Sequence, residues 1–166
     1  MSQALASRLV HRATRAGLTV AVAESLTAGL VCARIADVPG ASAVLRGGVV
    51  AYATDLKATL LDVDADLLAA HGPVHGQVAG QMAVGVRRRL GADLGAATTG
   101  VAGPLPSDGK AVGTVFVAVA DLAGVVVRGL VLDGDRAAVR RATTDHILAL
   151  LVERLPTGDG RLGGLG

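Results

Sequence analysis

The stretch Leu18-Thr19-Val20-Ala21-Val22-Ala23, followed directly by Glu24-Ser25-Leu26-Thr27-Ala28-Gly29, decides the fold. Its first half is a short, apolar run rich in β-branched residues, which is typical of a buried strand. The residues from Thr27 to Ala36 then favour a helix, which is stopped by Pro39-Gly40. A buried strand that leads through a polar turn into a helix is a building unit of α/β proteins.

The rest of the chain continues the alternation of helices and strands. Leu5, Leu9, Arg12 and Ala16 fall on one helical face that ends at Gly17. Downstream, the pattern predicts a strand at 43–51, helices at 55–61, 64–70 and 75–90, a strand at 94–98, a hairpin of 114–120 with 125–132, and a helix at 135–155. Within the strand at 43–51, the triplet Arg46-Gly47-Gly48 indicates a bulge or a close backbone approach.

This order of elements predicts the fold class and the domain organisation. We expect a single α/β domain, a layered α/β/α sandwich with a mixed sheet, over residues 1–156. The Gly-rich residues 157–166 are expected to form a disordered tail. A chain of 166 residues, with 51% apolar and 18% charged residues, has the length and composition of one domain with a large core.

Composition also excludes several classes of function. The one cysteine, Cys32, forbids an internal disulfide, and His71 and His75 are separated by Gly72-Pro73, so they cannot share a helix face as metal ligands. A net charge of +2, with one Tyr, one Phe and no Trp, argues against nucleic-acid binding. The basic run at 87–89 favours the solvated end of a helix over a partner surface.

The sequence also carries no sign of a membrane segment. Charged residues interrupt the first 17 positions, and no later run reaches the ~18 apolar residues of a spanning helix. The longest apolar run, from Ala111 to Val127, is interrupted by Gly113, Asp121 and Gly124 and is divided into two strands. We therefore expect a cytoplasmic protein with no membrane partner.

Three polar or glycine-rich loops follow predicted strands, and open α/β sheets bind their ligands at this edge. The loops are 23–29, 52–57 and the segment Thr99-Gly100-Val101-Ala102-Gly103-Pro104. Each also has an ordinary structural explanation, because Ser25 could cap the helix at 27–36 and Thr54 or Asp55 the next helix. The glycines could simply turn the chain. Their convergence at one edge favours a binding site.

Lys57 carries the strongest chemical signal. The chain has fourteen arginines and only two lysines, so at this position it uses the cation that can lose its proton. Near a helix start, burial would lower the lysine pKa and make the neutral amine available as a base. The alternative is an exposed lysine on the first helical turn.

Two further residues have more than one possible role or an ordinary one. Glu24 could orient Lys57 or cap a loop. Cys32 is expected to be a buried thiol in an apolar helix.

Five short motifs in this order resemble the CinA carboxy-terminal domain family, the nicotinamide mononucleotide deamidases. The motifs are the segments 23–29, 37–42 and 46–52, then Lys57, and finally 99–104, and the similarity runs from about Leu5 to Leu151. It extends to Val112-Gly113-Thr114-Val115 and to Gly134-Asp135-Arg136 with Arg140. The resemblance implies hydrolysis of the carboxamide of nicotinamide mononucleotide to nicotinic acid mononucleotide and ammonia, without a metal or cofactor.

The resemblance also implies roles for individual residues. Ser25 would be the nucleophile, activated by Lys57 and Tyr52. The substrate, a pyridine mononucleotide, would be bound by Thr27, Gly29, Gly47, Gly48, Thr99, Gly100, Ala102, Gly103 and Arg140. The family commonly forms dimers, so a homodimer or higher homo-oligomer is expected. A serine with a lysine base suits a chain without a well-placed Asp/His pair.

Some residues depart from the family pattern. Leu26 and Ala28 stand where the family has Cys and Gly, the approach to Lys57 reads Ala53-Thr54-Asp55-Leu56, and Leu105-Pro106-Ser107-Asp108-Gly109 replaces a glycine-rich stretch. A methyl group at Ala28 could block a close backbone contact. These departures favour a second hypothesis, a non-catalytic nucleotide- or partner-binding module. The intact Ser25, Tyr52 and Lys57 favour the enzyme.

Overall fold

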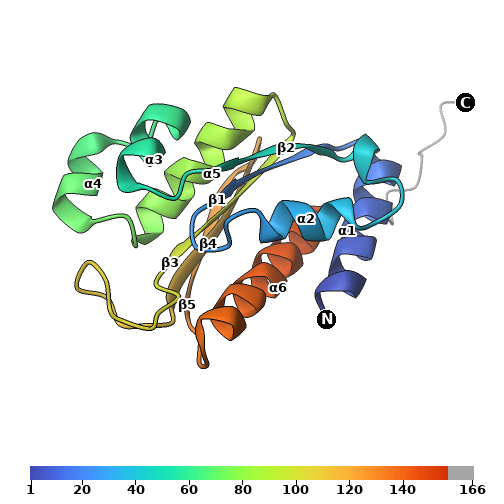
Figure 1. Cartoon of the computed structure of the whole chain (residues 1–166). Helices are drawn as coiled ribbons and strands as arrows, with labels where there is room; N and C mark the ends of the chain where they lie inside the picture. Colours follow the sequence, from blue (N-terminus) through green and yellow to red (C-terminus); the bar gives the residue numbers. More distant parts are fainter. Residues whose placement is uncertain (157–166) are drawn as a thin grey trace, which may run out of the picture.

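A five-stranded mixed sheet forms the centre of the protein (Figure 1). The computed structural model describes residues 1–156, so the tail predicted at 157–166 lies outside the described residues. The strands are β1 (Val20–Glu24), β2 (Leu45–Val50), β3 (Leu94–Gly100), β4 (Thr114–Asp121) and β5 (Gly124–Val131), in the order β2-β1-β3-β4-β5. β2, β1 and β3 are parallel, whereas β4 and β5 form an antiparallel hairpin at one side.

Helices cover both faces of this sheet. α1 (Ser2–Ala16), α2 (Leu30–Ala36) and α6 (Arg136–Arg154) pack on one face, and α3 (Thr54–Leu61), α4 (Ala65–His71) and α5 (Gly76–Leu90) lie on the other (Figure 1). A short 3₁₀ turn, η1 (Ala41–Ala43), leads into β2. The predicted α/β fold, a layered sandwich with a mixed sheet, is thus confirmed. No helix within residues 1–156 has both the length and the apolar character to cross a membrane.

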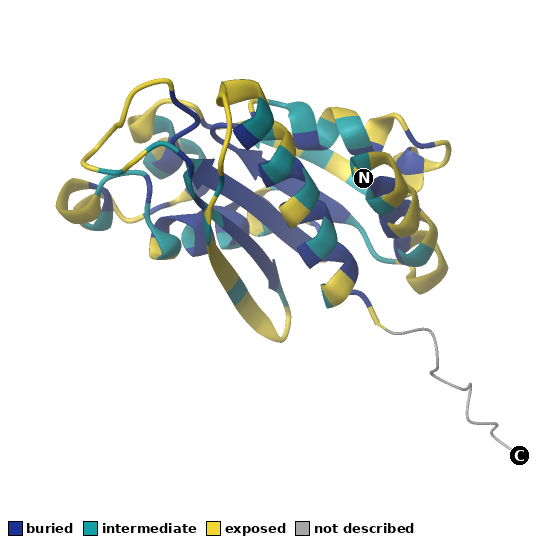
Figure 2. Cartoon of the chain, turned by 90° about the horizontal axis from the view of Figure 1, so that it is seen from below, coloured by how far each residue is buried: buried dark blue, intermediate teal, exposed yellow. Residues whose placement is uncertain are grey.

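Side-chain size differs between the two faces of the sheet. Along β1, Val20 and Val22 point into the core under α1, α2 and α6, whereas Ala21 and Ala23 point toward α5. β4 repeats this alternation, with valines on the first face and Ala118, Ala120 and the larger Phe116 on the second. The small side chains let α5 approach the sheet closely. Figure 2 shows the inner strands buried between the helical layers and the outer strand β5 largely exposed.

The Arg46-Gly47-Gly48 triplet in β2 coincides with an irregularity in the strand pairing. Val20 pairs with Leu45 and Ala21 with Gly47, so Arg46 is an extra residue at a bulge. A β-carbon on Gly48 would collide with the sulfur of Cys32 on α2. The predicted bulge is confirmed, and the close approach at Gly48 is made by helix α2.

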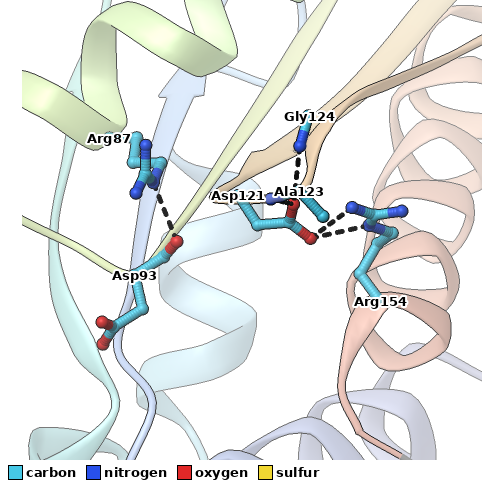
Figure 3. Close-up of polar contacts among 6 residues, drawn as sticks. All are labelled: Arg87, Asp93, Asp121, Ala123, Gly124 and Arg154. Carbon is cyan, nitrogen blue, oxygen red and sulfur yellow. Dashed lines mark hydrogen bonds and ion pairs between the residues drawn. The ribbon is translucent and has the colours of Figure 1, made fainter.

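Polar contacts fasten both helical layers to the sheet at the end opposite the carboxyl ends of the parallel strands (Figure 3). The Arg154 guanidinium on α6 pairs with the Asp121 carboxylate at the end of β4. On the other face, Arg87 Nε on α5 donates to the carbonyl oxygen of Asp93 at 2.9 Å. These contacts leave the carboxyl edge of the parallel strands available for a site.

Two local predictions are wrong. The helix after β1 begins at Leu30 and not at Thr27, because residues 25–29 form a separate turn in which Ala28 adopts a positive φ of 49°. Ser25 is therefore not the cap of this helix. Neither Thr54 nor Asp55 caps α3, whose capping position is Ala53 and has no side-chain hydrogen bond. Elsewhere, element ends differ from the prediction by a few residues, as expected for frayed termini.

Candidate active site

A cavity of about 290 Å³ lies where β1, β2 and β3 end. Ser25 follows β1, Tyr52 follows β2, and Thr99 and Gly100 end β3, and all four line the cavity. The loops predicted to converge therefore do so, at the carboxyl edge of the parallel strands. The volume is near the lower end of the range for small-molecule sites, which starts at roughly 300 Å³.

Backbone hydrogen bonds hold Ser25 in the wall of this cavity. Its N–H donates to the carbonyl oxygen of Thr98 at 3.0 Å, which extends the pairing of β1 with β3 by one residue. The turn that follows closes with a hydrogen bond from Ala28 N–H to the Ser25 carbonyl oxygen at 3.1 Å. The Ala28 side chain is exposed and Ala28 does not line the cavity, so its methyl group does not narrow the site.

Two charged side chains stabilise the 25–29 turn from outside the cavity. Arg140 on α6 donates to the carbonyl oxygens of Leu26 at 2.9 Å and Thr27 at 2.8 Å. The Glu24 carboxylate, 1% exposed, accepts hydrogen bonds from the backbone N–H groups of residues 29, 31 and 32. Glu24 therefore caps the start of α2. Of the two roles left open for Glu24, the structure favours the capping role.

Lys57 is the most deeply buried cation of the described chain, with 1% of its surface exposed. Its Nζ lies 3.2 Å from Ser25 Oγ, 2.8 Å from the carbonyl oxygen of Ala51 and 3.3 Å from that of Tyr52. Burial lowers the pKa of Lys57 from 10.5 to about 8, against the opposing effect of the Asp108 and Asp55 carboxylates. The prediction of an exposed lysine is excluded, and that of a buried lysine with a lowered pKa is confirmed.

These contacts suit a base for Ser25. A neutral amine has two hydrogens and one lone pair. The two carbonyl oxygens can accept the hydrogens, which leaves the lone pair for the hydroxyl hydrogen of Ser25. Near the pKa of about 8, a substantial fraction of Lys57 is neutral.

Tyr52 reaches Lys57 through its backbone and not through its ring. The Tyr52 hydroxyl accepts a hydrogen bond from Arg136 Nη2 at 2.6 Å, and Arg136 Nη1 donates to the carbonyl oxygen of Gly103 at 2.7 Å. Arg136 thus links the loop after β2 to the loop after β3 at the cavity wall. The ring of Tyr52 is half exposed and also lines the cavity.

Thr99 offers an acceptor to a ligand. Its hydroxyl donates to the carbonyl oxygen of Pro73 at 2.8 Å, so the lone pairs of the oxygen remain for a donor in the cavity. Gly100, Ala102 and Gly103 line the same wall. The remaining residues predicted to bind substrate do not line the cavity: Thr27 is buried and hydrogen-bonded to Thr98 Oγ1 at 2.8 Å, and Gly29, Gly47, Gly48 and Arg140 lie outside the lining.

Sequence reasoning assigned no site role to two charged residues of the cavity wall. Arg136 lies one helical turn before Arg140, and Asp108 lies in the segment that departs from the family pattern. The dipeptide Asp108-Gly109 was an available signal, because Asp-Gly favours a tight hairpin turn. Ser107 and Lys110 flank it with reciprocal backbone hydrogen bonds of 3.1 and 2.9 Å.

The other candidate residues lie apart from this chemistry. Burial and the neighbouring Glu24 carboxylate raise the pKa of the Cys32 thiol to about 12, so Cys32 is an inert side chain of α2. His71 ends α4 and His75 precedes α5, and their rings stack with centroids 4.6 Å apart. Among the described residues, no group of three or more His, Cys, Asp or Glu side chains is arranged to hold a metal ion.

Comparisons with known proteins identify relatives of the whole domain. A CinA-like protein of Frankia casuarinae is 50% identical over 151 residues, covering 86% of this chain and 35% of the relative. A putative competence-damage inducible protein of Desulforamulus reducens is 51% identical over 135 residues, covering 81% of this chain and 33% of the relative. The chain thus spans about a third of the length of these curated relatives.

A solved structure shows the same fold. The crystal structure of competence/damage inducible protein CihA from Agrobacterium tumefaciens superposes with a TM-score of 0.88 at 36% identity, covering 92% of this chain and 94% of that one. Residues 2–155 match the CinA C-terminal domain. The chain therefore belongs to the CinA C-terminal domain family.

Proposed function

We propose that this protein is an amidohydrolase that converts nicotinamide mononucleotide to nicotinic acid mononucleotide and ammonia. The observation that carries the proposal is the buried Lys57 Nζ, 3.2 Å from Ser25 Oγ in a cavity at the carboxyl edge of the sheet. Membership of the CinA C-terminal domain family supports the choice of substrate.

The proposed reaction proceeds through an ester on Ser25. Neutral Lys57 accepts the Ser25 proton while Ser25 Oγ forms a bond to the carboxamide carbon. The Lys57 ammonium then returns this proton to the nitrogen, the carbon–nitrogen bond breaks, and ammonia leaves. Lys57 next takes a proton from water, which attacks the ester, and the protonated lysine returns that proton to Ser25 Oγ as the acid is released.

The cavity wall supplies matching partners for the rest of the substrate. The Thr99 oxygen can accept a hydrogen bond from the carboxamide NH₂ group, because its own hydrogen is donated to Pro73. Arg136 is the arginine on the wall, and a guanidinium suits the planar, multiple contacts that a phosphate accepts. We assign the phosphate to Arg136 in place of Arg140, because Arg136 lines the cavity and Arg140 does not.

Ammonia release from nicotinamide mononucleotide tests the proposal. Wild-type protein should release ammonia, and Ser25→Ala should lower kcat by at least a thousandfold while the substrate still binds, because a nucleophile acts only in the chemical step. Nicotinamide riboside, which lacks the phosphate, should be a much poorer substrate for wild type. Binding without ammonia release by the wild-type protein would favour the non-catalytic nucleotide-binding module instead.

A further inference from the structure

A carboxylate faces the candidate active site from a loop in which this chain departs from its family. Asp108 lines the cavity that contains Ser25 and Lys57. It is the first central residue of the tight turn between Ser107 and Lys110, with φ of 52°, and Gly109 follows with φ of 70°. Positive φ at both central residues is the geometry that Asp-Gly favours in two-residue hairpin turns. The turn therefore fixes the direction of the Asp108 side chain.

A second loop packs against Asp108. The Asp108 β-carbon lies 3.4 Å from where a β-carbon on Gly72 would stand, which is an ordinary contact distance, so the two loops lie side by side here. One Asp108 carboxylate oxygen accepts a hydrogen bond from Ser107 Oγ at 2.9 Å. Asp108, an exposed residue, thus lies beside the α4–α5 connection and lines the cavity.

The cavity wall carries side chains of both charges. Of the lining residues, Lys57 and Arg136 are basic and Asp108 is acidic. The Asp108 carboxylate acts on Lys57 strongly enough to oppose the fall in the pKa of its amine. The same carboxylate must therefore act on any charge that a substrate places beside the Ser25–Lys57 pair.

We infer that Asp108 is a specificity-determining residue that selects amides whose carbonyl group is attached to a positively charged ring. This inference rests on the proposed function and deepens it. In a nicotinamide nucleotide the pyridinium ring is bonded directly to the carboxamide carbon that Ser25 attacks. A ring in this place lies beside Lys57 and within the field of Asp108, while the phosphate at the other end of the same molecule reaches Arg136.

The kinetic consequence lies mainly in substrate binding. The ring keeps its positive charge from the bound substrate through the ester intermediate, so Asp108 stabilises all of these states to a similar degree. An interaction of this kind changes KM more than kcat. Asp108 should therefore lower KM for the pyridinium substrate and leave KM for an uncharged ring unchanged or slightly higher.

Two matched variants separate this role from an indirect effect through Lys57. Asp108→Asn removes the charge and keeps a residue that tolerates positive φ and favours the turn, so the loop should retain its shape. Asp55 on α3 also acts on Lys57 but does not line the cavity. Asp55→Asn is therefore the control, since both variants should lower the Lys57 pKa and shift the ascending limb of the pH–rate profile to lower pH.

The experiment compares ammonia release from nicotinamide mononucleotide and from its reduced dihydropyridine form, which has the same phosphate and carboxamide but an uncharged ring. We expect Asp108→Asn to lower the ratio of kcat/KM for the charged over the uncharged substrate by about tenfold, the effect of one partly solvated charge pair. The loss should appear in KM for the charged substrate, and Asp55→Asn should leave the ratio unchanged.

The alternative results are distinct. An unchanged ratio in Asp108→Asn, or an equal fall in Asp55→Asn, would overturn the inference while the proposed function stands. Failure of the wild-type protein to hydrolyse either substrate would overturn the proposed function and this inference with it.

Discussion

Burial of Lys57 is unfavourable for stability, but it lowers the lysine pKa so that the amine can act as a base. Its amine is buried among two carbonyl oxygens and the Ser25 hydroxyl, without a carboxylate bonded to it. Burying a cation in this way is unfavourable, and the lowered pKa of about 8 reflects that cost. The same cost supplies a neutral amine near physiological pH, which an exposed lysine would not.

The first prediction concerns the stability contributed by this residue. Between pH 8 and 10.5 the unfolded chain keeps the Lys57 proton that the folded protein has lost, so folding becomes more favourable as the pH rises. Relative to Lys57→Met, the wild-type free energy of unfolding should increase by about 2–3 kcal/mol from pH 7 to pH 10. Urea denaturation of both proteins at several pH values measures this difference. Parallel curves would show that the folded protein does not lower the Lys57 pKa.

At the scale of elements, α5 positions α3 and therefore Lys57. A β-carbon on Gly85 of α5 would overlap the backbone carbonyl of Leu61, the last residue of α3. Gly80, one and a half turns earlier on the same helix, faces Val125 and Val127 at ordinary contact distances of 3.5 and 3.4 Å. Both glycines lie within the same helix, but only Gly85 must lack a side chain, because a β-carbon fits at Gly80.

The second prediction uses these glycines as a matched pair. Gly85→Ala should destabilise the protein by about 1–3 kcal/mol and lower ammonia release, because α3 must shift with Lys57 on it. Gly80→Ala should change stability by less than about 1 kcal/mol, in the stabilising direction that alanine favours inside a helix. Thermal melts and activity assays of both variants provide the measurement. Equal effects of the two substitutions would contradict the packing of α3 against α5.

For the whole molecule, the sequence predicted the layered sheet because apolar spacing near 3.6 and near 2 alternates clearly along the chain. It also predicted the edge at which Ser25, Tyr52 and Lys57 gather, since parallel strands end on one side. It did not distinguish Arg136 from Arg140. These residues lie one helical turn apart on the same side of α6, so only the packing of α6 against the sheet decides which one reaches the cavity.

The sequence also predicted a close approach at the Arg46-Gly47-Gly48 triplet, but not which residue makes it. Gly48 does need to lack a side chain, but the atom that requires this is the sulfur of Cys32 and not a ligand. The location of Asp108 depends on two loops distant in sequence, which meet at Gly72. Contacts of this kind form between residues far apart in the sequence, so local sequence patterns do not predict them.

The central claim is that Lys57 acts as the base for Ser25, and the pH dependence of ammonia release by wild type and Lys57→Arg tests it most directly. Arginine keeps the charge but stays protonated at every accessible pH, so it cannot accept the Ser25 proton. We predict that wild-type kcat/KM for nicotinamide mononucleotide rises with pH through a midpoint near 8, and that folded Lys57→Arg shows no such limb and loses nearly all activity. A folded Lys57→Arg protein that retains most of the wild-type rate would contradict the serine–lysine mechanism.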